Sequence, residues 1–211
     1  IISNDKYEEK KEIRIYQTDL NSIVITPPSL YDIISQKISD IGADTRISIE
    51  QLKHLLNLDN HKVGNKTIYL FLNPDDYKEL VFESNYTISK IDKEYEEEFE
   101  KFKSECSKKD LREGVVSLED AIVFGCFDRN KLVGVTSYWF WGENIADIGV
   151  IIHPDYREQS IGKALVSKLC NWGINNKKIN LYRHDEMNNK SHQLALSLNF
   201  KQYSYMEAMK L

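Results

Sequence analysis

The sequence lacks an excess of positive charge, and this absence narrows the classes of partner. Its 33 Asp and Glu residues outnumber its 28 Lys and Arg residues, which gives a net charge of −5 and a pI of about 5.6. Nucleic-acid-binding domains usually present a basic surface. The charge balance therefore argues against a nucleic-acid partner and is compatible with a cationic or amine-bearing one.

Long apolar runs are also missing. No stretch of the sequence approaches the roughly 20 apolar residues that a membrane-spanning helix needs, and no secretory signal is recognisable. Internal repeats and low-complexity tracts are absent as well. We therefore expect a cytoplasmic protein with no membrane partner.

Cysteine is scarce and does not follow the spacing of a metal site. The three cysteines lie in apolar-patterned segments, so we expect reduced thiols in the core. A second group resembles a metal cluster only superficially, because no known ligand spacing fits it; it comprises His184, Asp185, Glu186 and His192. We expect no metal.

What is present is enough apolar sequence for a core, with 41% hydrophobic and 11% aromatic residues among 211. Residues 1–83 are interpreted as a small α/β unit. It contains a strand over residues 22–26, a helix capped by Ser29, a helix capped by Ser48 and a strand over residues 66–72.

Residues 84–211 read strand, helix, three strands, helix, strand, helix, strand. The acidic run at residues 94–100 is the solvated face of the first helix. The helix over residues 160–175 buries an apolar stripe at helical spacing, made of Ile161, Ala164, Leu165, Leu169 and Trp172.

The most informative segment joins an apolar strand over residues 145–152 to that helix through a tight turn. Backbone N–H groups at such a junction lack intrahelical partners, and the helix dipole adds partial positive charge, which suits a phosphate. The turn reads Arg157-x-x-Ser160-x-Gly162. It lacks the glycine and the Ser or Thr of a P-loop. An ordinary strand–helix turn is the alternative interpretation.

This turn resembles the acetyl-CoA-binding motif of the GNAT superfamily of N-acetyltransferases, Arg/Gln-x-x-Gly-x-Gly/Ala, with Ser160 in place of the first glycine. Asn188-x-x-Ser191 followed by Asn199-Phe200 is similar to the family's last helix and strand. The resemblance covers about residues 85–211. The sequence of these motifs is similar to that of a bacterial subgroup with an N-terminal extension.

The resemblance implies an α/β (α+β) fold with a mixed, mostly antiparallel central sheet flanked by helices. Residues 84–211 would form the acetyltransferase domain and residues 1–83 a small α/β extension. Acetyl-CoA would be the acyl donor and an amine of a small molecule or peptide the acceptor. The implied cofactor-binding residues are Val150, Ile151, Ile152, Arg157, Glu158, Gln159, Ser160, Ile161, Gly162, Lys163, Asn188 and Ser191.

Three of these positions have open roles. If the turn needs a positive φ at Ser160, serine costs on the order of 1 kcal/mol relative to glycine; otherwise its hydroxyl can bind phosphate. Asn188 and Ser191 either contact the pantetheine or cap the last helix. A backbone N–H near Val150 or Ile151 can also polarise the thioester carbonyl.

Acyl transfer to an amine needs a base, because an alkylamine has a pKa near 10. Asp147 is the candidate, at a strand position where many family members have Glu; a structural ion pair is the alternative role, and Glu143 is the second candidate. The family's usual acid, a tyrosine, falls on Ala195. The sequence leaves Tyr203, Tyr205, His192 and water as alternatives.

Four aromatic residues precede this strand, and alternation sends two to each face of the sheet. One pair belongs to the core, and the other can line the acceptor pocket and attract an amine through cation–π contacts; the four are Tyr138, Trp139, Phe140 and Trp141. We also weigh a non-catalytic acyl-CoA-binding module and a transferase with a longer acyl donor. A monomer or homodimer is expected.

Overall fold

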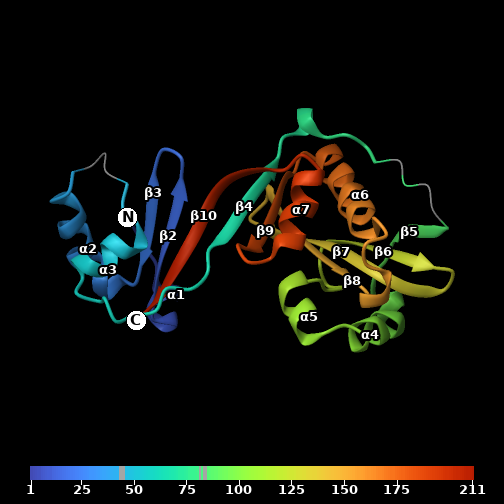
Figure 1. The fold of residues 1–211 in the computed structure, drawn as a ribbon, viewed down its shortest axis with the longest axis horizontal. Coiled ribbons are helices and arrows are strands. Elements are labelled where there is room, and N and C mark those ends of the chain that lie inside the picture. The colour runs from blue at the N-terminus through green and yellow to red at the C-terminus, as the bar shows by residue number, and fades with distance from the viewer. Residues whose placement is uncertain (43–45, 81, 83–84) are drawn as a thin grey trace. The chain divides into compact units, whose positions relative to one another are not determined.

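The protein is described by a computed structural model, which covers residues 1–42, 46–80, 82 and 85–211 (Figure 1). Its contacts divide the chain into two compact units. The first consists of residues 1–69, 185–188 and 202–211, and the second of residues 70–184 and 189–201. The predicted division into residues 1–83 and 84–211 cuts the chain once, whereas each of these units combines segments that are distant in the sequence. The predicted domain boundary therefore stays a prediction.

The first unit has strands in the order β1-β3-β2-β10, with β1 parallel to β3 and the other pairs antiparallel. An apolar core joins these strands to the helices, with Ile13, Ile34 and Leu52 fully buried. Its elements are β1 (Ile2–Ser3), α1 (Asp5–Lys10), β2 (Glu12–Thr18), β3 (Ser22–Thr26), α2 (Pro28–Ser39), α3 (Ile49–Leu55) and most of β10 (Lys201–Lys210).

Local sequence signals account for part of this unit. Ser48 caps α3 through a capping box with Gln51, so that prediction is confirmed. The predicted cap of α2 is wrong, because the helix begins two residues earlier, with Pro27 at the N-cap and Pro28 at N1, where proline needs no N–H partner. The Ser29 backbone N–H and hydroxyl instead donate to Glu8.

The second unit has strands in the order β4-β9-β8-β7-β6-β5. Neighbours from β5 to β8 are antiparallel, and β8 and β9 are parallel. Its strands are β4 (Thr67–Leu72, which enters from the first unit), β5 (Tyr86–Lys90), β6 (Ile122–Asp128), β7 (Lys131–Trp141), β8 (Ile145–Ile152) and β9 (Ile179–Asp185).

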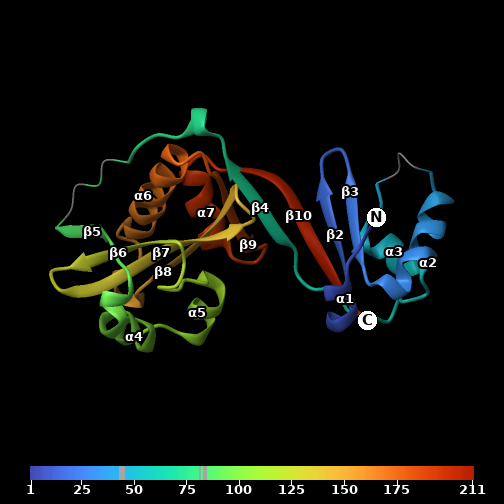
Figure 2. The ribbon, with the colours of Figure 1, turned by 180° about the vertical axis from the view of Figure 1, so that it is seen from behind.

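Helices cover both faces of this sheet. Figures 1 and 2 show α6 on one side of β6–β8 and α4 and α5 on the other. The helical elements are η1 (Pro74–Asp76), η2 (Lys93–Tyr95), α4 (Glu96–Ser104), α5 (Lys108–Gly114), η3 (Pro154–Tyr156), α6 (Ile161–Asn175) and α7 (Asn189–Ser197). On the α4 side, Phe99 and Phe102 pack against Val135 and Ile151 of the sheet.

The predicted order of elements for residues 84–211 and the mixed, mostly antiparallel sheet flanked by helices are both confirmed. The stripe on α6 is buried as expected, except that Trp172 is only half-buried. Among the described residues, no helix is long and apolar enough to span a membrane.

Candidate functional site

Strands β8 and β9 run side by side over only part of their length. Their parallel ladder begins at Ile145 and Ile179 and ends at Asp147 and Leu181. Both strands continue beyond that point, β8 to Ile152 and β9 to Asp185. On its other edge, β8 pairs with β7 along its whole length. The ladders of the described chain therefore leave residues 148–152 with one edge outside strand pairing.

The segment after β8 is fixed to α4 and α5 by polar contacts. His153 is 4% exposed; its Nε2 lies 2.8 Å from Glu105 and its Nδ1 accepts the Asp155 N–H at 3.2 Å. The Arg157 guanidinium forms an ion pair with Asp110 at 2.9 Å, and its Nε donates to the Ile152 carbonyl. Arg157 thus positions the turn. A phosphate contact through its side chain would compete with Asp110.

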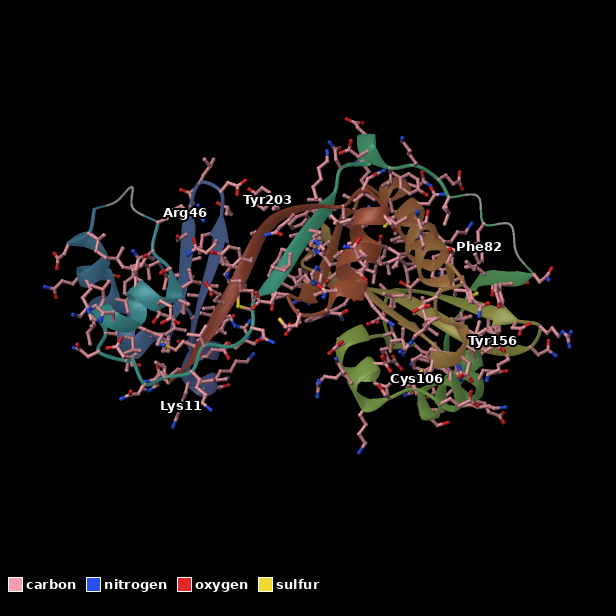
Figure 3. All side chains as sticks on the ribbon, viewed as in Figure 1. Lys11, Arg46, Phe82, Cys106, Tyr156 and Tyr203 are labelled. Atoms are coloured by element: carbon pink, nitrogen blue, oxygen red, sulfur yellow. The ribbon has the colours of Figure 1, made fainter. Side chains whose placement is uncertain are left out.

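Tyr156, labelled in Figure 3, and Gln159 add two further contacts. The Tyr156 hydroxyl donates to Asp128 at 3.0 Å, and the Tyr86 hydroxyl donates to the Gln159 side chain at 2.5 Å. Glu158 lies 3.8 Å from Lys190 of α7, with both side chains exposed. The turn is therefore held at several points before α6 begins.

The first turn of α6 is not closed by a side chain. Ser160, its N-cap, has φ 61° and ψ 4° and makes no capping hydrogen bond within the described chain. Glu158 also has a positive φ, 64°. The conformation at Ser160 is the one that favours glycine, so the expected strain applies. The N–H groups of Ile161, Gly162 and Lys163 belong to this uncapped turn and are available to an anion.

Gly149 allows α5 to lie directly on the open half of β8. A Cβ atom built at Gly149 would lie 2.4 Å from the Val115 carbonyl oxygen and 2.5 Å from that of Gly114. Gly162 is under no such constraint, because a Cβ there would meet Ile152 and Leu194 at ordinary contact distances of 3.5 and 3.6 Å. Close backbone approach requires a glycine at 149, whereas the packing within the chain does not require one at 162.

Asp147 lies where the β8–β9 ladder ends and is 5% exposed. The Arg183 guanidinium donates two hydrogen bonds to one of its carboxylate oxygens, the Nε bond at 2.8 Å. Burial raises the pKa of Asp147, and the hydrogen bond and charge of Arg183 act in the opposite direction. Asp147 is therefore both a base candidate with a raised pKa and half of a structural ion pair.

The four aromatic residues of β7 divide between the two faces, as alternation predicts. Tyr138 is fully buried on the α6 side, where its hydroxyl bonds the Leu169 carbonyl and the Asn180 side chain. Tyr138 is therefore a core residue, and its assignment to acceptor binding is wrong for that reason. Phe140 stacks on it.

Trp139 and Trp141 lie on the opposite face, in contact with each other. Trp139 pairs with Asp147 across the strands and is 55% exposed. The Arg183 guanidinium lies 4.7 Å from the centre of the Trp141 ring. These two aromatic side chains share a face with Asp147 and remain the acceptor-side candidates.

The start of α7 supplies the remaining predicted residues. Ser191 hydrogen-bonds Tyr182 of β9, whose pKa burial raises to about 12. Next to it, the His192 Nδ1 lies 3.1 Å from the Nε2 of His184. Asn188 belongs to the turn at residues 185–188, where its N–H donates to the Asp185 carbonyl.

The other candidates belong to segments other than the open half of β8. Glu143 is exposed in the β7–β8 turn, at the opposite end of β8 from the Ser160 turn. Tyr203 and Tyr205 belong to the first unit, where the Tyr205 ring contacts Lys66. Within the described residues, no three His, Cys, Asp or Glu side chains form a group that could hold a metal ion.

The three cysteines are free thiols, and Cys126 and Cys170 are buried. Burial raises the pKa of Cys106, labelled in Figure 3, and that of Cys126 to about 11. Cys126 and Cys170 therefore lie in the core as expected, whereas Cys106 is only half-buried.

Sequence reasoning did not identify Arg183 or Asp110, because each acts through a partner far along the chain. Leu-Tyr-Arg at residues 181–183 was visible as a pattern, and alternation along the strand puts Arg183 on the face of Leu181, the β9 partner of Asp147. Nothing in the sequence indicated which carboxylate it would meet.

Comparison with known proteins identifies the family. A model described as the acetyltransferase (GNAT) family matches residues 88–200. None of the curated proteins matches the chain.

Solved structures of GNAT proteins share the fold. One from Novosphingobium aromaticivorans DSM 12444 has 16% identity, covers 70% of this chain and has a TM-score of 0.53. An acetyltransferase of the GNAT family from Colwellia psychrerythraea has 11% identity over 92% of this chain and 78% of its own, with a TM-score of 0.59. A GCN5-related N-acetyltransferase-like protein from Streptococcus suis 89/1591 has 13% identity over 94% and 83%, with a TM-score of 0.55. The match covers 64% of the Novosphingobium protein, which is less than two thirds of its length.

Proposed function

The chain belongs to the acetyltransferase (GNAT) family, and from this membership we propose that it transfers an acetyl group from acetyl-CoA to an amine. The proposed acceptor is a primary amine of a small molecule or a peptide. The bacterial subgroup, a cytoplasmic location, a monomeric or homodimeric state and independence from metal stay predictions.

One observation supports the proposal most strongly. The open edge of β8 at residues 148–152 leads along the chain into the uncapped first turn of α6. An extended polar arm can add to the open edge as a strand does, and a pyrophosphate suits the uncapped N–H groups. A strand edge and a phosphate seat joined in this way fit the two ends of a CoA thioester.

The residues that would hold acetyl-CoA act mainly through backbone groups. Residues 150–152 of β8 would bond its pantetheine arm, each bond contributing about 1 kcal/mol. Ile161, Gly162 and Lys163 would offer their N–H groups to the pyrophosphate, and the Lys163 ammonium would add charge. When bound, acetyl-CoA supplies an acetyl group activated as a thioester.

Asp147 would take the proton that the amine must lose. Its raised pKa makes it a better proton acceptor than an exposed carboxylate, and Arg183 holds its orientation. Trp139 and Trp141 lie on the same face and would contact the acceptor, with a cation–π attraction before the amine loses its proton.

Heat stability and turnover together test the proposal. Acetyl-CoA should raise the unfolding temperature, since it binds only the folded protein. A panel of small alkylamines and short peptides should then release free CoA thiol in a colorimetric assay, with acetylated amine detected by mass spectrometry.

Three results would change the conclusion. No stabilisation by acetyl-CoA would remove the proposed donor. Stabilisation without turnover across the panel would favour the non-catalytic module, which Ser160 and Ala195 keep as the second hypothesis. Greater stabilisation and faster turnover with longer acyl-CoAs would identify a different donor.

A further inference from the structure

Two histidines of the second unit form a pair that the proposed chemistry has not used. His184 of β9 is 7% exposed, and His192 of α7 is half-buried. The His184 Nε2 lies 3.1 Å from the His192 Nδ1, and the rings meet edge to face with centres 5.1 Å apart. This distance is that of a hydrogen bond, so one ring donates and the other accepts.

The pair lies beside the part of β9 that has separated from β8. His184 is three residues beyond Leu181, where the ladder ends, and Val150 is three residues beyond Asp147 on β8. At about 3.3 Å per residue, both residues are about 10 Å beyond the last paired residues of the β8–β9 ladder. His184 therefore lies at the level of Val150, where the backbone is proposed to meet the thioester.

The side chains of β8 and β9 lie on two different faces of the sheet. Along β9, Arg183 points to the face of Asp147, whereas Tyr182 meets α7 through Ser191. Alternation puts His184 on the Tyr182 side. This is also the side of α6, whose first turn is the proposed phosphate seat. The histidine pair thus lies on the donor side of the sheet, and Asp147 lies on the other.

We propose that His192 donates the proton that the departing CoA sulfur needs, and that His184 positions its ring. This inference rests on the proposed acyl transfer. The His192 Nδ1 is engaged by His184, which leaves Nε2 as the nitrogen directed away from the pair. Ala195, the position of the family's usual tyrosine, lies one turn further along α7, so His192 can act from the same helix.

The proton balance is simple. The amine nitrogen forms a bond to the acyl carbon, the carbon–sulfur bond breaks, and its electron pair stays on sulfur. The amine proton passes to Asp147 and then to water, while protonated His192 gives its Nε2 proton to the sulfur. His192 regains a proton from solvent, so one proton is lost and one is gained.

Binding of CoA and of desulfo-CoA tests contact with the sulfur without any acceptor. In the 211-residue chain, His192→Asn keeps a polar group near His184 but removes Nε2, and His192→Gln retains a group near the Nε2 position. We expect His192→Asn to weaken CoA binding several-fold in calorimetry while leaving desulfo-CoA binding unchanged. Gln193→Ala, at the next and exposed position of α7, is the matched control and should change neither affinity.

The rate adds a second measurement. His192→Asn should lower turnover by about 100-fold, and its rate should depend on pH differently from that of the wild type at high pH. His184→Asn should lower turnover less and shift the high-pH part of the profile, as expected of a positioning residue. Added imidazole should partly restore His192→Ala.

The outcomes separate the two proposals. A wild-type protein that binds neither CoA nor desulfo-CoA overturns acyl transfer and this inference together. A second result overturns only the role of His192. In that result both ligands bind, and the His192→Asn and His192→Gln variants show the same ratio of CoA affinity to desulfo-CoA affinity, and the same pH profile, as the wild type.

Discussion

The two halves of β8 differ in how completely their polar groups are used. From Ile145 to Asp147 the strand pairs on both edges, and its one charged side chain is bound by Arg183. From residue 148 to residue 152 the ladders of the described chain involve one edge only. The open half leads into a turn with two residues of positive φ.

The helix starts of the second unit repeat this contrast. Ser107 and Asp110 form a complete capping box at the start of α5. The longer helix α6 begins at Ser160 without a side-chain cap in the described chain and in a strained conformation. The helix α4 also begins without a side-chain cap, but it continues from η2, whose start Asp92 caps. Because a cap contributes about 1 kcal/mol, the uncapped start of α6 beside an open strand edge is what the proposed phosphate seat predicts. The comparison teaches that the proposed site is built mainly from backbone groups without partners in the described chain.

The largest effect on turnover should come from residues 145–147, the half of β8 that is paired on both edges. We expect Asp147→Asn to lower turnover by about 100-fold with acetyl-CoA affinity nearly unchanged, because the proposed contacts with acetyl-CoA come mainly from the backbone. The deficit should shrink as pH rises, since more amine is then unprotonated. Steady-state kinetics over a pH series measure both effects. Glu97→Gln, at an exposed position of α4, serves as the control.

Two results would contradict this assignment. Wild-type turnover with an unchanged pH profile would remove Asp147 from the mechanism. If Asp147→Asn unfolds instead, the ion pair with Arg183 is mainly structural, since removing one member of a buried pair costs several kcal/mol.

The next effect concerns the open half. Gly162→Asp should abolish the rise in unfolding temperature that acetyl-CoA produces, because a carboxylate would lie where the pyrophosphate binds. That stabilisation is about 2.7 kcal/mol at a ligand concentration 100 times Kd. Gly162→Ala is the matched control, as its Cβ meets only ordinary contacts, and it should retain most of the shift. An unchanged shift in the Asp variant would move the pyrophosphate elsewhere.

A smaller effect is expected where α5 lies on the open half. Gly149→Ala would bring a Cβ within 2.4 Å of a backbone oxygen, so α5 must move. We expect a loss of about 1 to 3 kcal/mol in the free energy of unfolding, as for other overpacked sites. Chemical denaturation measures it, again with Gly162→Ala for comparison. A stability equal to the wild type would show that α5 is loosely held.

The smallest effect sharpens the comparison at Ser160. Ser160→Gly should stabilise the free protein by up to about 1 kcal/mol by relieving the positive φ, and leave CoA binding equal or tighter. Chemical denaturation and calorimetry measure the two quantities. Clearly weaker CoA binding would show instead that the serine hydroxyl contacts phosphate.

Periodicity explains what could be predicted from the sequence. The α6 stripe from Ile161 to Leu169 repeats at helical spacing, and the capping box at Ser48 lies within four residues, so both were visible. The Asp147–Arg183 and His184–His192 contacts join different elements, and no local pattern specifies such partners. The burial of Tyr138 was hidden too, because alternation assigns faces without saying which face is covered.

The pairing of β2 with β10 has a consequence for the order of folding. Glu12 lies opposite Lys210, so the first unit needs two segments that lie far apart in the sequence. During synthesis from the N-terminus, residues 70–184 and 189–201 emerge before most of β10 does, and we expect the second unit to close first. Until then the β2 edge that later receives β10 lies open, as exposed strand edges do in aggregation-prone intermediates. Residues 1–69 are thus made before the second unit and completed after it.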